Sequence, residues 1–301
     1  MSTLLLSLLR KKNTHFRTSD AMLTIQNLQH TPLATIVKAF GSAFADYAVD
    51  FNESEVYSIL KRRGFDASSS YAAFDDNEIV GFTLNGIGRV DGLLSAYDTG
   101  TGVVKDYRGQ GLSARIFTHS LPYLKAQGIE QYVLEVLQNN EPAIKVYQDL
   151  GFGVHRTLRC YRQEKPEALR SFSLCTVERC PLSALLPAAA FQDFAPSWQN
   201  SFDSLQRAGE DLICLAAKLQ EEIVGYCVFD PLTGDLSNIA VSPDYRRRGI
   251  GSRLLNEMYP LLQTDAVKCL NIAEGGEELC AFLEKCGYEL LCQQYEMVRK
   301  V

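Results

Sequence analysis

The chain has 301 residues, of which 46% are hydrophobic, and its 30 Lys and Arg against 36 Asp and Glu give a formal net charge of -6. This length is sufficient for two globular domains, and the negative charge excludes a general attraction to nucleic acid or anionic membranes. No apolar run is long enough to span a bilayer, and none of the nine cysteines forms a C-x-x-C pair. We therefore predict a cytoplasmic protein with free thiols and no metal site.

The first half begins with residues 1–21, which we expect to form an extension outside the fold. Its apolar start precedes Arg10-Lys11-Lys12, the reverse of the order in a secretory signal. Periodicity and turn residues then predict strands near 23–28, 70–74, 79–88, 94–104, 131–136 and 152–161, and helices within 33–63, up to about 127, and at 140–150.

A charged segment, Gln163-Glu164-Lys165-Pro166-Glu167, contains a proline and no large apolar residue, so it is the predicted linker. It divides the chain into domains at 22–164 and 165–301. In the second half we expect strands near 172–178, 212–219, 223–229, 236–241 and 269–272, and helices near 249–262 and 277–286.

One phrase occurs twice, as Tyr107-Arg108-Gly109-Gln110-Gly111-Leu112-Ser113 and Tyr245-Arg246-Arg247-Arg248-Gly249-Ile250-Gly251. Each copy lies between a strand-like run and a helical pattern, where glycines let main-chain N–H groups approach an anion at the positive end of a helix. The flanking segments Glu78-Ile79-Val80-Gly81-Phe82 and Glu222-Ile223-Val224-Gly225-Tyr226 also match. We infer that a whole domain with a pyrophosphate-binding loop has been duplicated.

The two loops resemble the signature of the GNAT superfamily of acyl-coenzyme A dependent N-acyltransferases: Arg or Gln, two residues, Gly, one residue, then Gly or Ala. Arg246, Gly249 and Gly251 match it fully, whereas Ser113 replaces the last small residue in the first half. Leu134-Glu135-Val136, Asn139-Asn140, Ala143, Tyr147 and Gly151-Phe152 are similar to the later part of many GNAT enzymes. The resemblance implies an α/β (α+β) fold of two tandem GNAT-like domains, each with a mixed, mostly antiparallel central sheet flanked by helices.

The resemblance also implies acetyl-CoA as co-substrate. The expected cofactor-binding residues are Val103, Val104, Arg108, Gly109, Gln110, Gly111, Leu112, Ser113 and Asn140 in the first half and Val241, Arg246, Arg247, Arg248, Gly249, Ile250, Gly251 and Ser252 in the second. The N–H groups of Val103 and Val104 are expected to polarise the thioester carbonyl.

Two residues of the first half are the expected catalytic pair. A phenol with a pKa near 10 can protonate a departing thiolate, and the resemblance gives Tyr147 this role, with packing on the helix's core face as the alternative. Glu135 interrupts an apolar strand and is similar to the glutamate that helps to deprotonate the amine in protein N-terminal acetyltransferases; a salt-bridged or edge-facing glutamate is the alternative. Asp98 is a weaker base candidate, for which a turn role beside Thr99-Gly100 is the favoured alternative, and Lys61-Arg62-Arg63 is expected on a solvated helix face.

The second half lacks the expected acid. Leu283 stands where the first half has Tyr147, and Asn271 or Ala273 where it has Glu135. Asp235 could be a base, although we expect it at the surface. The first half is therefore predicted to be catalytic and the second to be degenerate, binding acetyl-CoA or supporting the acceptor cleft.

The predicted function is N-acetyl transfer to a primary amine of a small molecule or peptide by direct attack on the thioester, in a monomer or homodimer without a nucleic-acid or membrane partner. Two alternatives remain open. The second half could be the catalytic one, or the chain could be a non-catalytic coenzyme A binding or sensing protein with a tandem GNAT fold.

Overall fold

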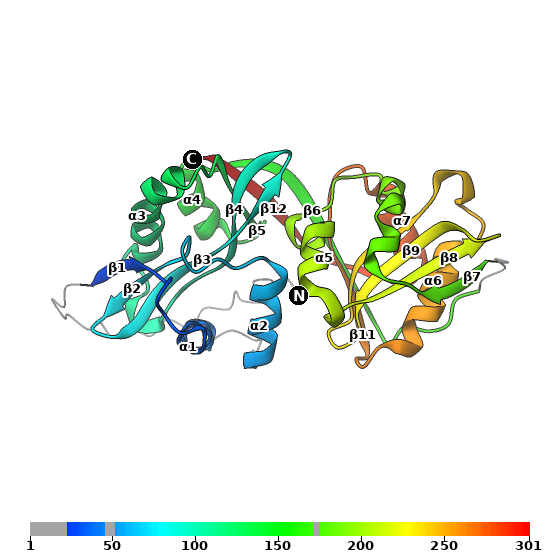
Figure 1. Cartoon of the computed structure of the whole chain (residues 1–301), viewed down its shortest axis with the longest axis horizontal. Helices are drawn as coiled ribbons and strands as arrows, with labels where there is room; N and C mark the ends of the chain where they lie inside the picture. The colour runs from blue at the N-terminus through cyan, green and yellow to red at the C-terminus, as the bar shows by residue number, and fades with distance from the viewer. Residues whose placement is uncertain (1–22, 46–51, 171–174) are drawn as a thin grey trace. The chain divides into compact units, whose positions relative to one another are not determined.

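The computed structural model describes residues 23–45, 52–170 and 175–301, so the predicted extension at 1–21 lies outside the described residues (Figure 1). The chain forms two compact units. The first unit contains the described residues up to His155 together with Tyr295–Val301, and the second contains Arg156–Gln294. Strands β6 (Gly153–Glu164) and β12 (Glu289–Lys300) therefore each contribute residues to both units.

The first unit is a mixed sheet with a pair of helices on each face. Its elements are β1 (Thr24–Asn27), α1 (Leu33–Phe44), α2 (Glu53–Arg62), β2 (Tyr71–Asp75), β3 (Glu78–Val90), β4 (Leu93–Val103), α3 (Leu112–Ala126), β5 (Gln131–Leu137) and α4 (Glu141–Asp149). The strand order is β1-β2-β3-β4-β5-β12. The pairs from β1 to β4 are antiparallel, and β4–β5 is parallel. Helices α1 and α2 cover one face, and α3 and α4 cover the other (Figure 1).

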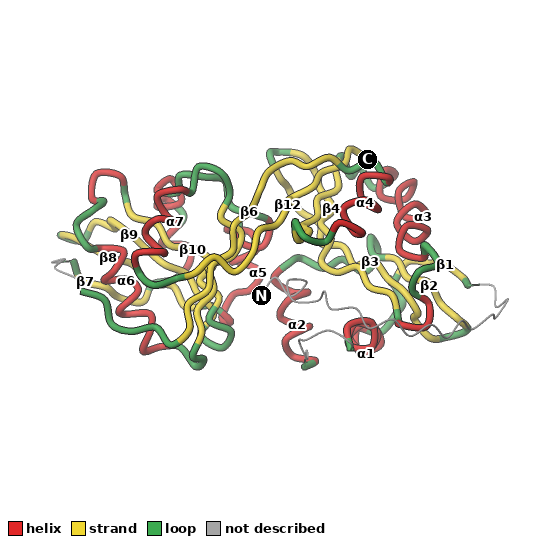
Figure 2. The backbone as a smooth tube through the Cα atoms, turned by 180° about the vertical axis from the view of Figure 1, so that it is seen from behind, coloured by secondary structure: helices red, strands yellow, loops and turns green. Residues whose placement is uncertain are grey.

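The second unit repeats this plan. Its elements are β7 (Thr176–Arg179), α5 (Phe202–Ala208), β8 (Ile213–Leu219), β9 (Glu222–Asp230), β10 (Asp235–Val241), α6 (Ile250–Met258), β11 (Ala266–Ile272) and α7 (Glu277–Lys285). The order β6-β11-β10-β9-β8-β7 is antiparallel except for the parallel pair β10–β11. Helices α6 and α7 pack on one face of the sheet (Figure 2). The two units confirm the predicted tandem fold of mostly antiparallel sheets flanked by helices.

Local sequence explains where several elements begin and end. Asn52 and Glu55 form a capping box that starts α2, because the Asn52 side chain accepts from the Glu55 N–H at 2.9 Å and the Glu55 carboxylate accepts from the Asn52 N–H at 3.1 Å. Gly151 and Gly287 end α4 and α7 with φ of 87° and 89°, the left-handed conformation that glycine adopts without strain. The predicted helix stop at Gly151 is confirmed.

In each unit, a side chain near the end of the last strand binds the carbonyl at a helix stop in the same way. In the first unit Arg299 of β12 donates to the Leu150 carbonyl, and in the second Gln163 of β6 donates to the Cys286 carbonyl at 2.8 Å. Leu150 and Cys286 each precede the glycine that ends a helix, so the two contacts are equivalent. Because β6 continues to Glu164, the first two residues of the predicted linker belong to a strand.

Candidate active sites

A separation of two parallel strands forms the centre of each candidate site. In the described part, β4 and β5 pair only over Ser95–Tyr97 and Gln131–Val133, although β4 continues to Val103 and β5 to Leu137. Strands β10 and β11 pair only at Asp235 and Lys268. The unpaired ends leave main-chain groups that an extended ligand can bind.

The duplicated loop has the same backbone geometry in both units. Gly109 and Gly111 have φ of 78° and 69°, and the corresponding Arg247 and Gly249 have φ of 61° and 77°. Gly111 and Gly249 are the N-caps of α3 and α6. The first turn of a helix has N–H groups without intrahelical partners and attracts anions. A Cβ at Gly109 or Gly111 would meet no atom within 4 Å, so the first loop lies against open space, as an anion cradle requires.

The leading arginine of each loop turns back toward the end of the preceding strand. Arg108 donates to the carbonyls of Val103 at 2.9 Å and Ala43 at 2.7 Å. Arg246 donates to the equivalent carbonyls, those of Val241 at 3.1 Å and Phe191 at 3.0 Å.

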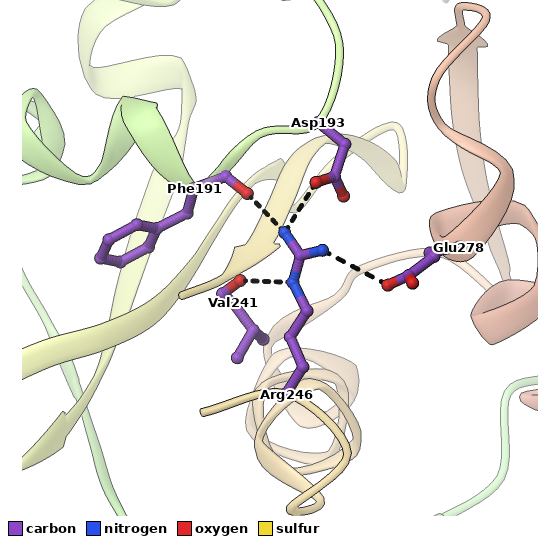
Figure 3. Close-up of polar contacts among 5 residues, drawn as sticks. All are labelled: Phe191, Asp193, Val241, Arg246 and Glu278. Carbon is purple, nitrogen blue, oxygen red and sulfur yellow. Dashed lines mark hydrogen bonds and ion pairs between the residues drawn. The ribbon is translucent and has the colours of Figure 1, made fainter. Parts of the chain in front are cut away.

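Arg246 also binds two carboxylates, Asp193 at 2.9 Å and Glu278 at 3.3 Å (Figure 3). In the second unit, part of the charge expected to bind a pyrophosphate is therefore already paired. Arg247 follows in the same loop and also lines the cavity of this unit, so it remains a candidate for binding a phosphate.

The main-chain N–H groups of the two valines before the first loop point to different edges of β4. The N–H of Val104 donates to the Val80 carbonyl at 2.9 Å, so the expectation that it polarises a thioester carbonyl is wrong. Successive N–H groups of a strand point to opposite edges, and the N–H of Val103 therefore points toward the separation between β4 and β5.

A cavity of about 110 Å³ lies where β4 and β5 separate in the first unit. Tyr147, Asp98 and Ser113 line it together with Thr83, Thr101, Phe117, Tyr132, Leu134, Ala143, Val146, Leu150 and Phe152. The Tyr147 ring packs at 5.8 Å, centroid to centroid, against Phe152. Tyr147 thus both packs on the core, as the alternative interpretation expected, and borders the cavity.

Asp98 is the acidic residue of this cavity. It is 8% exposed and lies within β4, next to the extra residue Thr99 of an irregularity in that strand, so its expected place in a turn is wrong. Burial raises the pKa of Asp98 to about 6. Hydrogen bonds from the Thr101 hydroxyl, at 2.9 Å, and from the Gly100 N–H oppose this rise, and so does the charge of Arg63. A carboxyl group with this pKa can accept a proton near neutral pH. The apolar strand pattern around Asp98 was the signal that could have revealed its burial.

Glu135 lies on the other face of the sheet. Its neighbours Leu134 and Val136 pack into the core beneath α3 and α4, so alternation directs Glu135 toward the face of α1 and α2. Arg63, only 4% exposed, is on that face; it donates to the Thr99 carbonyl at 2.9 Å, and its guanidinium lies 6.0 Å from the Tyr97 ring centroid. The expected solvated helix face is therefore wrong for Arg63, and sequence reasoning missed its role.

The second unit has a larger cavity of about 500 Å³, lined by the ends of β10 and β11, the loop and α7. Buried amides surround it. Asn238 accepts from Gln192 at 2.5 Å and donates to the Asn200 carbonyl at 2.9 Å, and Asn200 donates to the Leu270 carbonyl at 2.8 Å. These groups can bind a polar, uncharged chain, but amides do not exchange protons near neutral pH.

The base predicted from the sequence, Asp235, and the residue at the position of Tyr147, Leu283, do not line the cavity of the second unit. Leu283 is fully buried in the core under α7, and Asp235 is outside the set of cavity-lining residues. Asp235 is 2% exposed and accepts from the Ser237 hydroxyl at 3.0 Å, so its expected surface position is wrong.

The remaining predicted cofactor residues have varied environments. Asn140 is the N-cap of α4 and accepts from the Ala143 N–H at 3.3 Å. Leu112 and Ile250 are buried, and the Arg248 guanidinium lies 5.3 Å from the Tyr245 ring centroid. Gly251 and Ser252 line the large cavity, whereas Gln110 lies in the loop ahead of α3. Their contacts with a cofactor remain predictions.

The sequence matches the model of the Acetyltransferase (GNAT) family twice, over residues 36–152 and 183–288. The chain belongs to this family. The two matches correspond to the two halves and confirm the tandem arrangement predicted from the repeated loop.

Relatives with assigned names match parts of the chain. Mycothiol acetyltransferase of Streptomyces avermitilis is 34% identical over 100 residues, which are 33% of this chain and 32% of that protein. N-alpha-acetyltransferase 30 of Schizosaccharomyces pombe is 31% identical over 102 residues, 34% of this chain and 68% of that protein. The match thus spans about a third of the mycothiol acetyltransferase.

Solved structures share the fold over most of the chain. A tandem GNAT protein from the clavulanic acid biosynthesis pathway has a TM-score of 0.69 at 13% identity, covering 93% of this chain and 98% of that one. A GCN5-related N-acetyltransferase from Sphaerobacter thermophilus has a TM-score of 0.66 at 14% identity, covering 94% and 96%.

The described residues contain no group of three His, Cys, Asp or Glu side chains that could hold a metal ion. Nor does any helix among them have the length and apolar character needed to cross a membrane.

Proposed function

We propose that the protein is an acetyl-CoA dependent N-acetyltransferase that modifies a primary amine in its first unit. The observation that carries the proposal is the shared lining of the small cavity: Tyr147 and Asp98 both border it, beside Ser113 in the first turn of α3. Groups that can donate and accept protons thus lie next to an anion-binding helix terminus and a strand edge.

The backbone of the first unit fits this co-substrate. The loop from Gly109 to Ser113 would hold the diphosphate on its N–H groups, and the N–H of Val103 would bind the extended arm or polarise the carbonyl. Acetyl-CoA supplies the acetyl group as a thioester when bound.

Proton transfers are assigned to side chains on the two faces of the sheet. The amine nitrogen forms a bond to the acetyl carbon as the carbon–sulfur bond breaks. Glu135 accepts the proton that the amine loses, and Tyr147 donates a proton to the leaving sulfur. Asp98, close to Tyr147 in the cavity lining, is a second candidate for the acceptor of a proton.

The name of one relative, N-alpha-acetyltransferase 30, supports a nitrogen acceptor. We therefore propose a primary amine, of a small molecule or a peptide, as the acceptor.

Replacing Tyr147 by Phe tests this assignment, because it keeps the ring that packs on Phe152 and removes only the hydroxyl. With thiol release measured over a panel of primary amines, we expect kcat to fall at least about tenfold, corresponding to about 1.4 kcal/mol, and the KM for acetyl-CoA to change by less than about twofold. Tyr123→Phe, at a residue 51% exposed on α3, is the control. A Tyr147→Phe protein with full turnover would refute the role of Tyr147.

A second function is favoured by the large cavity of the second unit. We propose that this unit binds coenzyme A without catalysis, since Leu283 stands at the position of Tyr147 and the carboxylates of the cavity lining, Asp193 and Glu278, pair with Arg246. Titration calorimetry with coenzyme A should give two sites per chain, and a stoichiometry of one would argue against binding by the second unit.

A further inference from the structure

The large cavity of the second unit is rich in positive charge. Its charged lining residues are four cations and two carboxylates, a net charge of +2 (4 minus 2): Arg170, Arg246, Arg247, Lys285, Asp193 and Glu278. The whole chain has a formal net charge of -6. Among the described residues, no Lys or Arg lines the smaller cavity of the first unit. Positive charge is therefore concentrated at the cavity of the second unit.

Three of these cations are available to a ligand. Arg246 is paired with both carboxylates of the lining. Arg170, Arg247 and Lys285 are exposed, and none of their side chains forms an ion pair or hydrogen bond with the described part of the chain. They come from three different segments: the stretch after β6, the loop ahead of α6, and the last residue of α7. Three separate segments thus bring a cation that can bind a ligand to the same cavity.

The first unit lacks two of these cations. Gly109 stands where the second unit has Arg247 (247 minus 109 is 138, the offset between the loops), and Asp149 stands where it has Lys285 (285 minus 149 is 136, the offset between the helix stops). Asp149 and Lys285 are the last residues of α4 and α7, in agreement with this correspondence. Arg247 has a φ of 61°, a left-handed conformation that is less favourable for arginine than for glycine. The added charge is therefore specific to the second unit.

Arg170 is held beside α6, away from the loop. The preceding residue, Leu169, donates from its N–H to the Asn256 side-chain oxygen at 2.7 Å, and the Asn256 amide donates to the Leu169 carbonyl at 2.8 Å. Asn256 is six residues after Ile250, the first residue of α6 (256 minus 250), which is about 9 Å along the helix axis. Arg170 thus lies at a part of the cavity distinct from the helix terminus that would hold a diphosphate.

Lys285 reaches the cavity from α7, next to an apolar part of the lining. Phe282, about one turn before Lys285, packs against the first turn of α6, because its ring would lie 2.9 Å from a Cβ at Gly251. Leu169 and Leu279 also line the cavity, and both pack on the core of the second unit with Phe282. An apolar wall beside cations suits a nucleotide, because the base has a flat apolar face and the phosphates are anionic.

We propose that Arg170 and Lys285 form a subsite for the 3′-phosphate of coenzyme A, which makes the second unit selective for coenzyme A over 3′-dephospho-coenzyme A. This inference rests on the proposed binding of coenzyme A by the second unit. A phosphate monoester carries a charge of about -1.5 to -2 at pH 7, so two cations can match it. The loop and Arg247 remain for the diphosphate. The first unit, with Asp149 at the position of Lys285, should bind the two ligands alike.

Calorimetry on two full-length variants separates the units, because Gly111→Asp blocks the loop of the first unit and Gly249→Asp blocks that of the second. In Gly111→Asp we expect coenzyme A to bind at least about fivefold tighter than 3′-dephospho-coenzyme A at low salt, with a smaller difference at high salt. In Gly249→Asp the two ligands should differ by less than about twofold. In the wild type, only one of the two sites should weaken when 3′-dephospho-coenzyme A replaces coenzyme A, and this measurement requires no variant.

Equal affinities for the two ligands at both sites of the wild type would overturn the inference and leave coenzyme A binding by the second unit intact. A single coenzyme A site in the wild type, lost in Gly111→Asp, would overturn both.

The double variant Arg170→Gln with Lys285→Gln tests the two cations directly. It should weaken coenzyme A binding by the second unit about fivefold and change the affinity for 3′-dephospho-coenzyme A by less than about twofold. Arg179→Gln, which removes an exposed cation of β7 outside the cavity lining, is the control. An equal loss of affinity for both ligands would overturn the assignment to the 3′-phosphate, and so would an unchanged affinity for coenzyme A.

Discussion

Asp98→Asn should stabilise the first unit at neutral pH. The carboxyl group is 8% exposed, and burial raises its pKa to about 6 from an ordinary value of 3.8. A shift of about two units, at 1.36 kcal/mol per unit, corresponds to a differential free energy of at most about 3 kcal/mol. The Asn side chain has nearly the same shape and can still accept from the Thr101 hydroxyl, so the substitution removes mainly the buried charge.

The direction of the pH dependence follows from the raised pKa. The folded protein binds the Asp98 proton more tightly than the unfolded chain, so the resulting stabilisation is present below about pH 4 and is lost as the pH rises through about 6. The Asp98→Asn variant has no carboxyl group at this position, so it does not lose stability in this way as the pH rises. Its free energy of unfolding should therefore increase relative to the wild type as the pH rises, and roughly half of the 3 kcal/mol should develop between pH 5 and pH 7.

Urea unfolding of both proteins at pH 5, 7 and 8 measures this difference. Far-UV circular dichroism reports on the whole chain, whereas the single tryptophan, Trp198, lies in the second unit and provides an internal control. A stability difference that stays constant from pH 5 to pH 8 would refute the charged, buried state of Asp98.

Three further predictions concern the loops and the last strand. Gly111→Asp should abolish turnover because its carboxylate repels the diphosphate, while Gly249→Asp should remove one coenzyme A site by calorimetry and leave turnover; the reverse outcome would make the second unit catalytic. Glu278→Gln should free part of the charge of Arg246 and tighten coenzyme A binding in the second unit about threefold at low salt, an effect that should weaken at high salt; unchanged affinity would count against competition for Arg246. Met297→Ala should destabilise the first unit by about 2–4 kcal/mol in urea unfolding, because Met297 is fully buried there; a loss below about 1 kcal/mol would contradict its place in that core.

The sequence was sufficient to predict the tandem fold because the decisive signals are local. The positive φ of Gly109 and Gly111 and the glycine stops after α4 and α7 depend on residues next to one another in the chain. Alternation and turn residues likewise located the hairpin from β2 to β3, with Asp76 at a φ of 52° in its turn.

Other features could not be predicted from the sequence because they depend on residues that are distant in the chain. No strand was expected at 289–300, since β12 has polar residues such as Gln294 and Glu296 at buried positions, and these residues are accommodated by two different units. Arg63 appeared to belong to a solvated basic run, but it turns inward because the Thr99 carbonyl and the Tyr97 ring are present on another element. Periodicity within one segment contains no information about such partners.

The comparison of the two units separates the scaffold from the chemistry. Both units have the loop, the helix terminus and the separating strands, so these features account for a cofactor-binding scaffold and cannot explain a difference in activity. The difference lies in the side chains at the separation: Tyr147 and the buried Asp98 line the cavity of the first unit, whereas in the second the carboxylates of the lining, Asp193 and Glu278, pair with Arg246 and Leu283 stands at the position of Tyr147. A buried amide network is neutral and stable, whereas buried carboxylates reduce stability unless they bind a cation or a proton. If Asp98 is kept for function, replacing it by its amide should raise the stability of the first unit and lower its turnover. Replacing the amides Asn200 and Asn238 of the second unit by Ala should lower stability without such a gain.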